Sequence, residues 1–194
     1  MRYVFLAIPA ALAAGLILAS QTTAQQQPAR QSDEELMRLA MSAAPASVAQ
    51  QAAIVAVGED GEIRTLREGS NAFTCVADIP AIPGEDPMCL DRNGWEWAQA
   101  WLSKQTPPEA PGFGYMFAGG CNAAGQDPFE TGRPANWVET GPHVMVLGGV
   151  AAQMEGHPEG GQNAKVPFIM WSGTPFAHLM VPVGERAELT AEQK

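Results

Sequence analysis

Residues 143–147, His-Val-Met-Val-Leu, and residues 176–183, Phe-Ala-His-Leu-Met-Val-Pro-Val, have the apolar composition expected of central β-strands. Each segment contains a His-x-Met pattern. Residues i and i+2 of a strand point to the same face of the sheet, so each histidine shares a face with the methionine that follows it. The residues between and after them are valine or leucine, which makes the opposite face apolar as well. Both strands are therefore predicted to be central, and His143 and His178 to be buried.

Two buried histidines beside two methionines form a candidate metal site. A buried imidazole needs a polar partner, because leaving it unpaired costs about 1–3 kcal/mol. If the two strands are neighbours, His143 and His178 converge with Met145 and Met180, and Met170 could add a further sulfur. Imidazole and thioether groups form a soft ligand set that suits copper, especially Cu(I). The predicted function is therefore the binding of a small ligand, with copper as the specific candidate.

Core packing is the alternative explanation of the same patterns. A buried histidine is equally satisfied by a backbone carbonyl or a carboxylate, and methionine fills irregular cores well. A three-residue motif is weakly specific, so this alternative stays open.

The rest of the chain predicts a small α+β domain over residues 32–184, with a mainly antiparallel sheet and one or two helices packed on one face. A capping box at Ser32 begins a short helix that Pro45 ends. A second helix begins at Asp91 or Asn93 and runs to about Lys104, where Pro107 and Pro108 follow. Further strands are expected at residues 52–57, 62–67 and 73–76, which form three antiparallel strands, and at 112–118 and 167–171. The buried face of the second helix is predicted to hold Trp95, Ala98, Trp101 and Leu102.

The first 24 residues have the pattern of a secretory signal peptide. Arg2 is followed by about 17 apolar residues and then by small and polar residues that end at Ala24, the preferred cleavage point. A retained membrane anchor is the alternative, although this apolar run is at the lower limit for crossing a bilayer. A flexible leader over residues 25–31 and a flexible tail over residues 185–194 complete the predicted organisation. The mature protein is expected to be periplasmic or secreted.

The charge balance bears on partners. With 11 Lys plus Arg against 21 Asp plus Glu, the formal net charge is −10. Such a surface repels phosphate backbones and anionic lipid headgroups, which argues against nucleic-acid and membrane-surface binding. A small ligand or a metal ion is the expected partner, and the oligomeric state is left open.

All three cysteines follow the predicted signal peptide. Cys75 and Cys89 flank the Pro-rich loop 78–87, and a disulfide between them would close about 15 residues and stabilise the fold by roughly 3 kcal/mol. Cys121 is left unassigned. A thiol-dependent enzyme or hydrolase, with Cys121 beside His143 or His157, is one alternative function. A structural or interaction protein of the cell envelope is another.

Five short segments also carry a resemblance. They are Thr74-Cys75, Pro87-Met88-Cys89, residues 141–146 (Gly-Pro-His-Val-Met-Val), residues 170–175 (Met-Trp-Ser-Gly-Thr-Pro) and His178-Leu-Met180. Together they resemble a family of functionally uncharacterised exported bacterial proteins, over about residues 35–183. The resemblance implies export and a single domain, and it carries no catalytic or binding residue.

Overall fold

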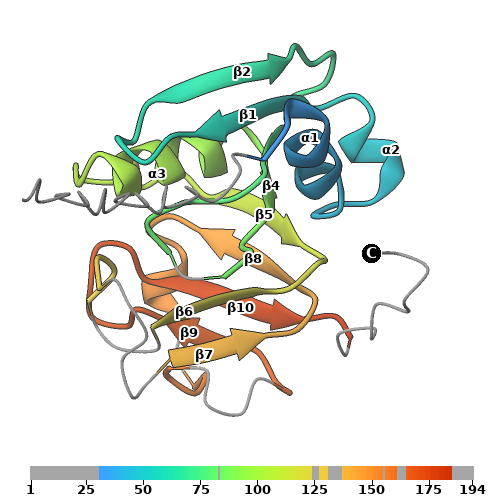
Figure 1. Ribbon diagram of the computed structural model, residues 1–194. Coiled ribbons are helices and arrows are strands. Elements are labelled where there is room, and N and C mark those ends of the chain that lie inside the picture. The colour runs from blue at the N-terminus through green and yellow to red at the C-terminus, as the bar shows by residue number, and fades with distance from the viewer. Residues whose placement is uncertain are drawn as a thin grey trace, which may run out of the picture. The chain divides into compact units, whose positions relative to one another are not determined.

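An eight-stranded sheet forms the centre of the structure, a computed structural model that describes residues 31–184 except 83, 124–126, 131–136, 155 and 161–164 (Figure 1). The strand order is β2-β1-β3-β4-β5-β8-β10-β9, and β6 and β7 form a separate two-stranded sheet. The strands are β1 (Ala53–Val57), β2 (Ile63–Arg67), β3 (Thr74–Val76), β4 (Met88–Leu90), β5 (Gly112–Met116), β6 (Gly120–Ala123), β7 (Trp137–Thr140), β8 (His143–Leu147), β9 (Phe168–Met170) and β10 (His178–Pro182). The predicted signal peptide, the leader up to residue 30 and the tail from residue 185 lie outside the described residues.

All neighbouring strands of the large sheet pair antiparallel except β1 and β3, which are parallel. The expected run of three antiparallel strands is therefore wrong at this pair. The β1–β2 hairpin puts β2 at the edge of the sheet, where its largely exposed side chains remain in water. The largely buried β3 pairs with the other side of β1, in the interior of the sheet, and it runs parallel to β1.

Helices cover both faces of the large sheet. They are α1 (Asp33–Met41), α2 (Ala46–Ala49) and α3 (Arg92–Leu102), with a short 3-10 turn, η1 (Ala151–Gln153). In β4, Leu90 packs in the same cluster as Trp97 of α3, whereas Cys89 packs with Leu39 of α1. Because consecutive strand residues point to opposite faces, α3 and α1 lie on opposite sides. The predicted α+β class is confirmed, but the helices lie on both faces of the sheet rather than on the one face that the sequence predicted.

The predicted disulfide between Cys75 and Cys89 is present. The two residues are register partners on β3 and β4, with Cα atoms 4.0 Å apart. The Pro-rich loop 78–87 is thus the connection between two paired strands, and the disulfide joins them at the base of that loop.

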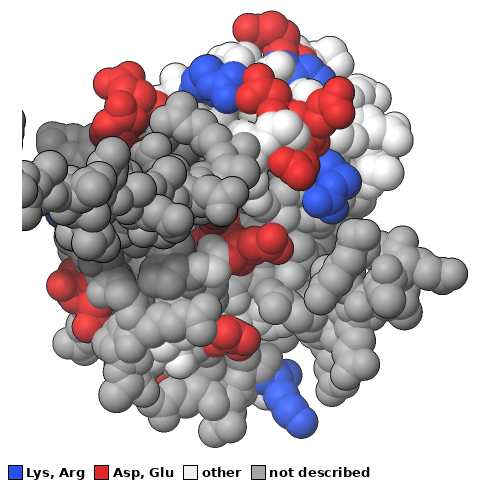
Figure 2. All heavy atoms as spheres, in the orientation of Figure 1, with Lys and Arg blue, Asp and Glu red and all other residues white. Residues whose placement is uncertain are grey.

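The ends of α1 and α3 follow the capping rules that their sequences predict. Ser32 and Glu35 form a reciprocal capping box ahead of α1, and Asp91 accepts a hydrogen bond from the backbone N–H of Gly94 at the start of α3. Asp33 of α1 also binds Arg64 of β2 at 2.7 Å. Acidic and basic side chains accordingly lie together over this end of the molecule, at the top of Figure 2.

The buried face of α3 contains only two of the four predicted residues, Ala98 and Trp101. Trp97, Ala98 and Trp101 are buried, while Trp95 and Leu102 are only half-buried. None of the helices in the described ranges is both long and apolar enough to cross a membrane.

Candidate functional site

The two His-x-Met strands are neighbours, as the metal hypothesis requires. In the antiparallel register of β8 and β10, Met145 lies directly opposite Met180. His143 lies opposite Pro182, four positions beyond His178 on β10. The histidines therefore occupy opposite ends of the strand pair, with the two methionines between them.

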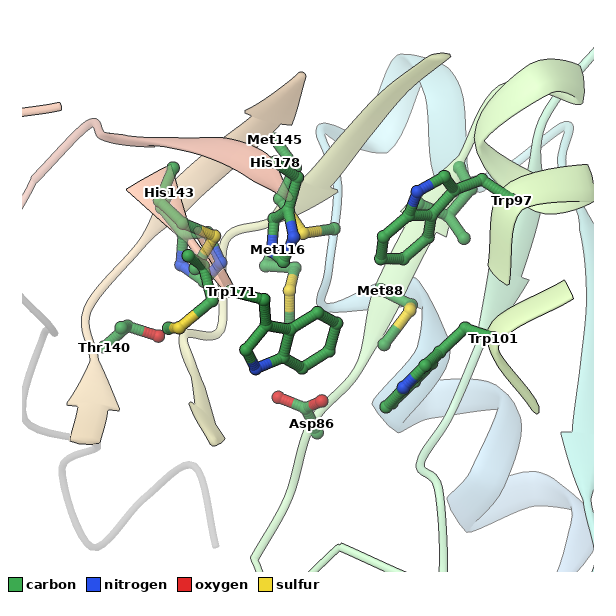
Figure 3. Close-up of a pocket in the computed structure, with 13 residues that line it drawn as sticks. Asp86, Met88, Trp97, Trp101, Met116, Thr140, His143, Met145, Trp171 and His178 are labelled. Carbon is green, nitrogen blue, oxygen red and sulfur yellow. The ribbon is translucent and has the colours of Figure 1, made fainter. Parts of the chain in front are cut away.

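All four predicted residues line one cavity between the sheet and α3 (Figure 3). Its walls contain five methionines, three tryptophans, two histidines, one leucine, one threonine and one aspartate: Met88, Met116, Met145, Met170, Met180, Trp97, Trp101, Trp171, His143, His178, Leu90, Thr140 and Asp86. Every one of these residues is buried. The sulfurs come from five different strands, so the cavity exists only because the sheet brings these strands together.

The cavity has a volume of about 40 Å³. A single water molecule needs about 10–15 Å³ measured in this way, whereas pockets for drug-sized organic ligands hold about 300–1,000 Å³. The space therefore suits an ion or a few solvent molecules, and it narrows the predicted small ligand to that size.

Buried polar side chains of the described residues are concentrated at this cavity. The four buried polar or charged residues are Asp86, Thr140, His143 and His178, and all four line it. Thr140 donates a hydrogen bond from its hydroxyl to the carbonyl of Gly120, 3.1 Å away. Burying a polar group costs free energy unless the group is paired. Four such groups around one cavity therefore favour a binding site over packing alone.

Both imidazoles are held in one tautomer. Nδ1 of His143 lies 2.7 Å from the carbonyl oxygen of Gly141, and Nδ1 of His178 lies 2.9 Å from that of Phe176. A carbonyl only accepts hydrogen bonds, so each Nδ1 carries the proton and donates. The lone pair of a neutral ring is then on Nε2. Metal-binding histidines in proteins are commonly oriented in this way by a backbone carbonyl.

Burial keeps both rings neutral. Loss of solvation lowers the pKa of His143 from 6.5 to about 4, and the hydrogen bond to Gly141 offsets part of this shift. Burial likewise lowers the pKa of His178 to about 4; the hydrogen bond to Phe176 offsets part of this shift, and repulsion from His143, when that ring is protonated, adds a smaller lowering. At neutral pH no proton competes for either Nε2.

Nε2 of His143 and the indole N–H of Trp97 are the two polar atoms of the cavity-lining side chains that are buried without a hydrogen-bond partner among the described residues. Only Nε2 of His143 has a lone pair to offer. The desolvation cost of such an atom is about 1–3 kcal/mol. A metal ion in the cavity would use the lone pair that no described residue uses.

Aromatic rings enclose His178. Its ring makes edge contacts with Trp171, at 5.0 Å between centroids, and with Trp97, at 5.3 Å. Trp97 also stacks on Trp171 at 6.2 Å and contacts Phe176 at 5.5 Å. These rings remove water from one side of the imidazole, which explains the low pKa of His178.

Sequence reasoning missed Met88 and Met116 as cavity residues. In β5, Met116 points to the same face as Gly112 and Gly114, and the aromatic residues between them point to the other face. A strand face made of glycines leaves space above the sheet, and this alternation was the signal available in the sequence. Met88 belongs to a three-residue strand after Pro87, which has no period of its own. Sequence reasoning also predicted no strand at β6, whose pairing with β7 depends on backbone hydrogen bonds rather than on a hydrophobic pattern.

The remaining candidate residues add no second site. Across the described ranges, no group of three or more His, Cys, Asp or Glu side chains has an arrangement suited to a metal ion. Cys121 is in β6, and its side chain lies outside the described set, so its proposed catalytic role stays a prediction. His157 is half-buried in a loop and does not line the cavity.

Comparison with protein-family models, with curated proteins and with solved structures finds no match for this chain. The resemblance to a family of exported bacterial proteins accordingly stays a prediction.

Proposed function

We propose that this chain is an exported protein that binds one copper ion in the cavity between the sheet and α3. His143 and His178 are the nitrogen ligands, and Met145 and Met180 supply sulfur. The observation that carries the proposal is Nε2 of His143, a buried lone pair with no partner in the described part of the chain, on the wall of an ion-sized cavity.

The chemistry of the donors supports copper over harder ions. Thioethers and neutral imidazoles bind copper well and bind magnesium or calcium poorly, since those ions prefer oxygen. Both histidines are neutral at physiological pH because their pKa values are about 4. The Cys75–Cys89 disulfide is compatible with an oxidising compartment, where export would place the protein.

A metal titration with histidine variants tests the proposal. The purified chain lacking residues 1–24 is titrated with Cu(II), with Zn(II) and, without oxygen, with Cu(I) in competition with a coloured chelator. The wild type is expected to bind one copper ion. The double variant His143→Ala with His178→Ala is expected to bind at least about 100-fold more weakly, which corresponds to the loss of about 3 kcal/mol of binding free energy.

His157→Ala is the matched control, because it removes the other histidine of the chain without touching the cavity. It should leave copper affinity unchanged. Near-ultraviolet circular dichroism of the cavity tryptophans establishes that each variant is folded. Equal copper binding by the wild type and a folded double variant would end the proposal.

A further inference from the structure

Each histidine of the cavity has a methionine directly opposite it on the neighbouring strand. Met116 of β5 is the register partner of His143, and Met170 of β9 is the register partner of His178. Directly opposed residues of an antiparallel pair have Cβ atoms about 4.5–5.5 Å apart on the same face. Together with the Met145–Met180 pair, these two His–Met pairs cross β5, β8, β10 and β9.

The paired donors are neutral. Met88 from β4 brings the number of cavity thioethers to five, and each imidazole offers the lone pair of Nε2, because its Nδ1 donates to a backbone carbonyl. Neutral ligands do not offset the charge of a buried ion, and Asp86 is the one carboxyl group among the residues of the cavity wall. The Born cost of burying an ion grows with the square of its charge, so a divalent ion costs about four times as much as a monovalent ion of equal size. This donor set therefore favours a single positive charge.

Trp171 is held at the cavity wall by an unusual backbone conformation. Its backbone φ of 54° is in the left-handed region, which is strained for a bulky residue and costs about 1–3 kcal/mol. Thr174 holds this conformation, because its hydroxyl donates to the carbonyl of Trp171 at 2.8 Å. The strained turn brings the indole to the cavity wall beside His178. An indole face attracts cations within about 6 Å.

We propose that the cavity selects a monovalent soft cation, Cu(I), over Cu(II) and Zn(II), and that Met116 and Met170 determine this selectivity as the sulfur partners of His143 and His178. The inference rests on the proposed copper site and adds the oxidation state and two further ligands.

Silver and zinc provide the direct test. Ag(I) is a monovalent soft ion that does not change oxidation state under the conditions of a titration, and Zn(II) is a divalent ion of borderline softness. Binding to the purified chain lacking residues 1–24 is followed by equilibrium dialysis and by tryptophan fluorescence. The wild type is expected to bind Ag(I) at least about 100-fold more tightly than Zn(II).

The double variant Met116→Leu with Met170→Leu removes both sulfurs at nearly constant volume, a change that cores usually tolerate. It should weaken Ag(I) binding at least tenfold and reduce the ratio of Ag(I) to Zn(II) affinity. Met37→Leu is the matched control, since Met37 packs in the cluster on the α1 side of the sheet. Its affinities should equal those of the wild type.

Each outcome separates this inference from the copper site itself. Equal affinity for Zn(II) and Ag(I) would overturn the selectivity while leaving the metal site. Unchanged Ag(I) affinity in the methionine variant, with loss of binding in the histidine variant, would overturn the role of Met116 and Met170 alone. If the methionine variant does not fold, X-ray absorption of the silver-loaded wild type decides, because ligation without sulfur contradicts the inference. Failure to bind any of these ions would overturn both proposals.

Discussion

On one face of the large sheet, α1 and α2 pack through alanines around a disulfide, whereas on the other face α3 packs through tryptophans, methionines and two histidines. The buried alanines of the first cluster are Ala40, Ala43, Ala44, Ala49, Ala52 and Ala77. Alanine has no side-chain torsion to order, so such a face packs closely at little entropic cost. The second face uses the most flexible apolar side chain at five positions around a cavity. Close packing thus accounts for the residues on the α1 face of the sheet, but not for those on the α3 face.

The contrast between the two faces puts the candidate site on the α3 face. Every buried polar or charged side chain found among the described residues lies on the α3 face, at the cavity. Removing features of the α1 face should change stability without changing metal binding. Removing features of the α3 face should change both.

Acidification should produce the largest effect, and it acts on the α3 face. In the metal-free folded protein the pKa values of His143 and His178 are about 4, below the 6.5 of an ordinary histidine. Between these values the unfolded state binds more protons, so stability falls as the pH decreases from about 6.5 to about 4. Each histidine contributes on the order of 3 kcal/mol to this loss. Urea unfolding at pH 7, 5.5 and 4 measures it.

His178→Phe separates the contribution of this histidine from those of the other groups that take up protons as the pH falls. Phenylalanine keeps an aromatic ring against Trp97 and Trp171, and it should remove about half of the pH-dependent loss. A variant with the same pH dependence as the wild type would contradict the assignment to His178.

The disulfide gives the next largest effect, on the α1 face. Replacing Cys75 and Cys89 together by alanine should lower the free energy of unfolding by about 3 kcal/mol, because the unfolded chain regains the freedom of the closed loop. Copper affinity should not change, since both residues pack with α1 and not with the cavity. Denaturant unfolding and metal titration check the two parts. Reduced copper binding by a folded variant would show that the two faces are coupled.

The sequence predicted those parts of the fold in which a local pattern is enough. The strand over residues 143–147 has the predicted bounds. Its five residues are enough to identify a β-strand and to show which side chains share a face. The capping residues Ser32 and Asp91 mark the starts of α1 and α3, because a cap is a chemical signal at a single position. Short strands such as β4 have too few residues to show a period, and they become strands only through their partners.

The candidate site was predictable within a strand but not between strands. His143 and Met145 share a face by the geometry of one strand, so their association followed from the sequence. The pairing of Met116 with His143 depends on β5 lying beside β8, although the β6–β7 hairpin separates them in the chain. Nothing in the sequence around Met116 indicates that β5 and β8 are neighbours.

Gly114→Ala should have a smaller effect than loss of the disulfide, again on the α3 face. Gly114 is the register partner of Met145, and an added Cβ would lie 2.8 Å from the methyl carbon of Met145 and 2.6 Å from a methyl of Leu90. Relieving this contact should cost about 1–3 kcal/mol of stability. Because Met145 must move, copper affinity should also fall. Thermal unfolding and titration of the same sample measure both, and lower stability with unchanged affinity would show that Met145 is not a ligand.

Ser32→Ala should give the smallest effect and act on the α1 face alone. The hydroxyl of Ser32 accepts the backbone N–H of Glu35 at 3.2 Å, and the Glu35 carboxylate accepts the N–H of Ser32 at 2.8 Å. Alanine removes the first of these bonds, and loss of such a cap typically costs about 1 kcal/mol. Ser32→Asp keeps an acceptor and adds a negative charge at the helix N-terminus, so it should retain wild-type stability. If both variants were equally destabilised, the cap would not be the cause. If either variant changed copper affinity, the two faces would not be independent.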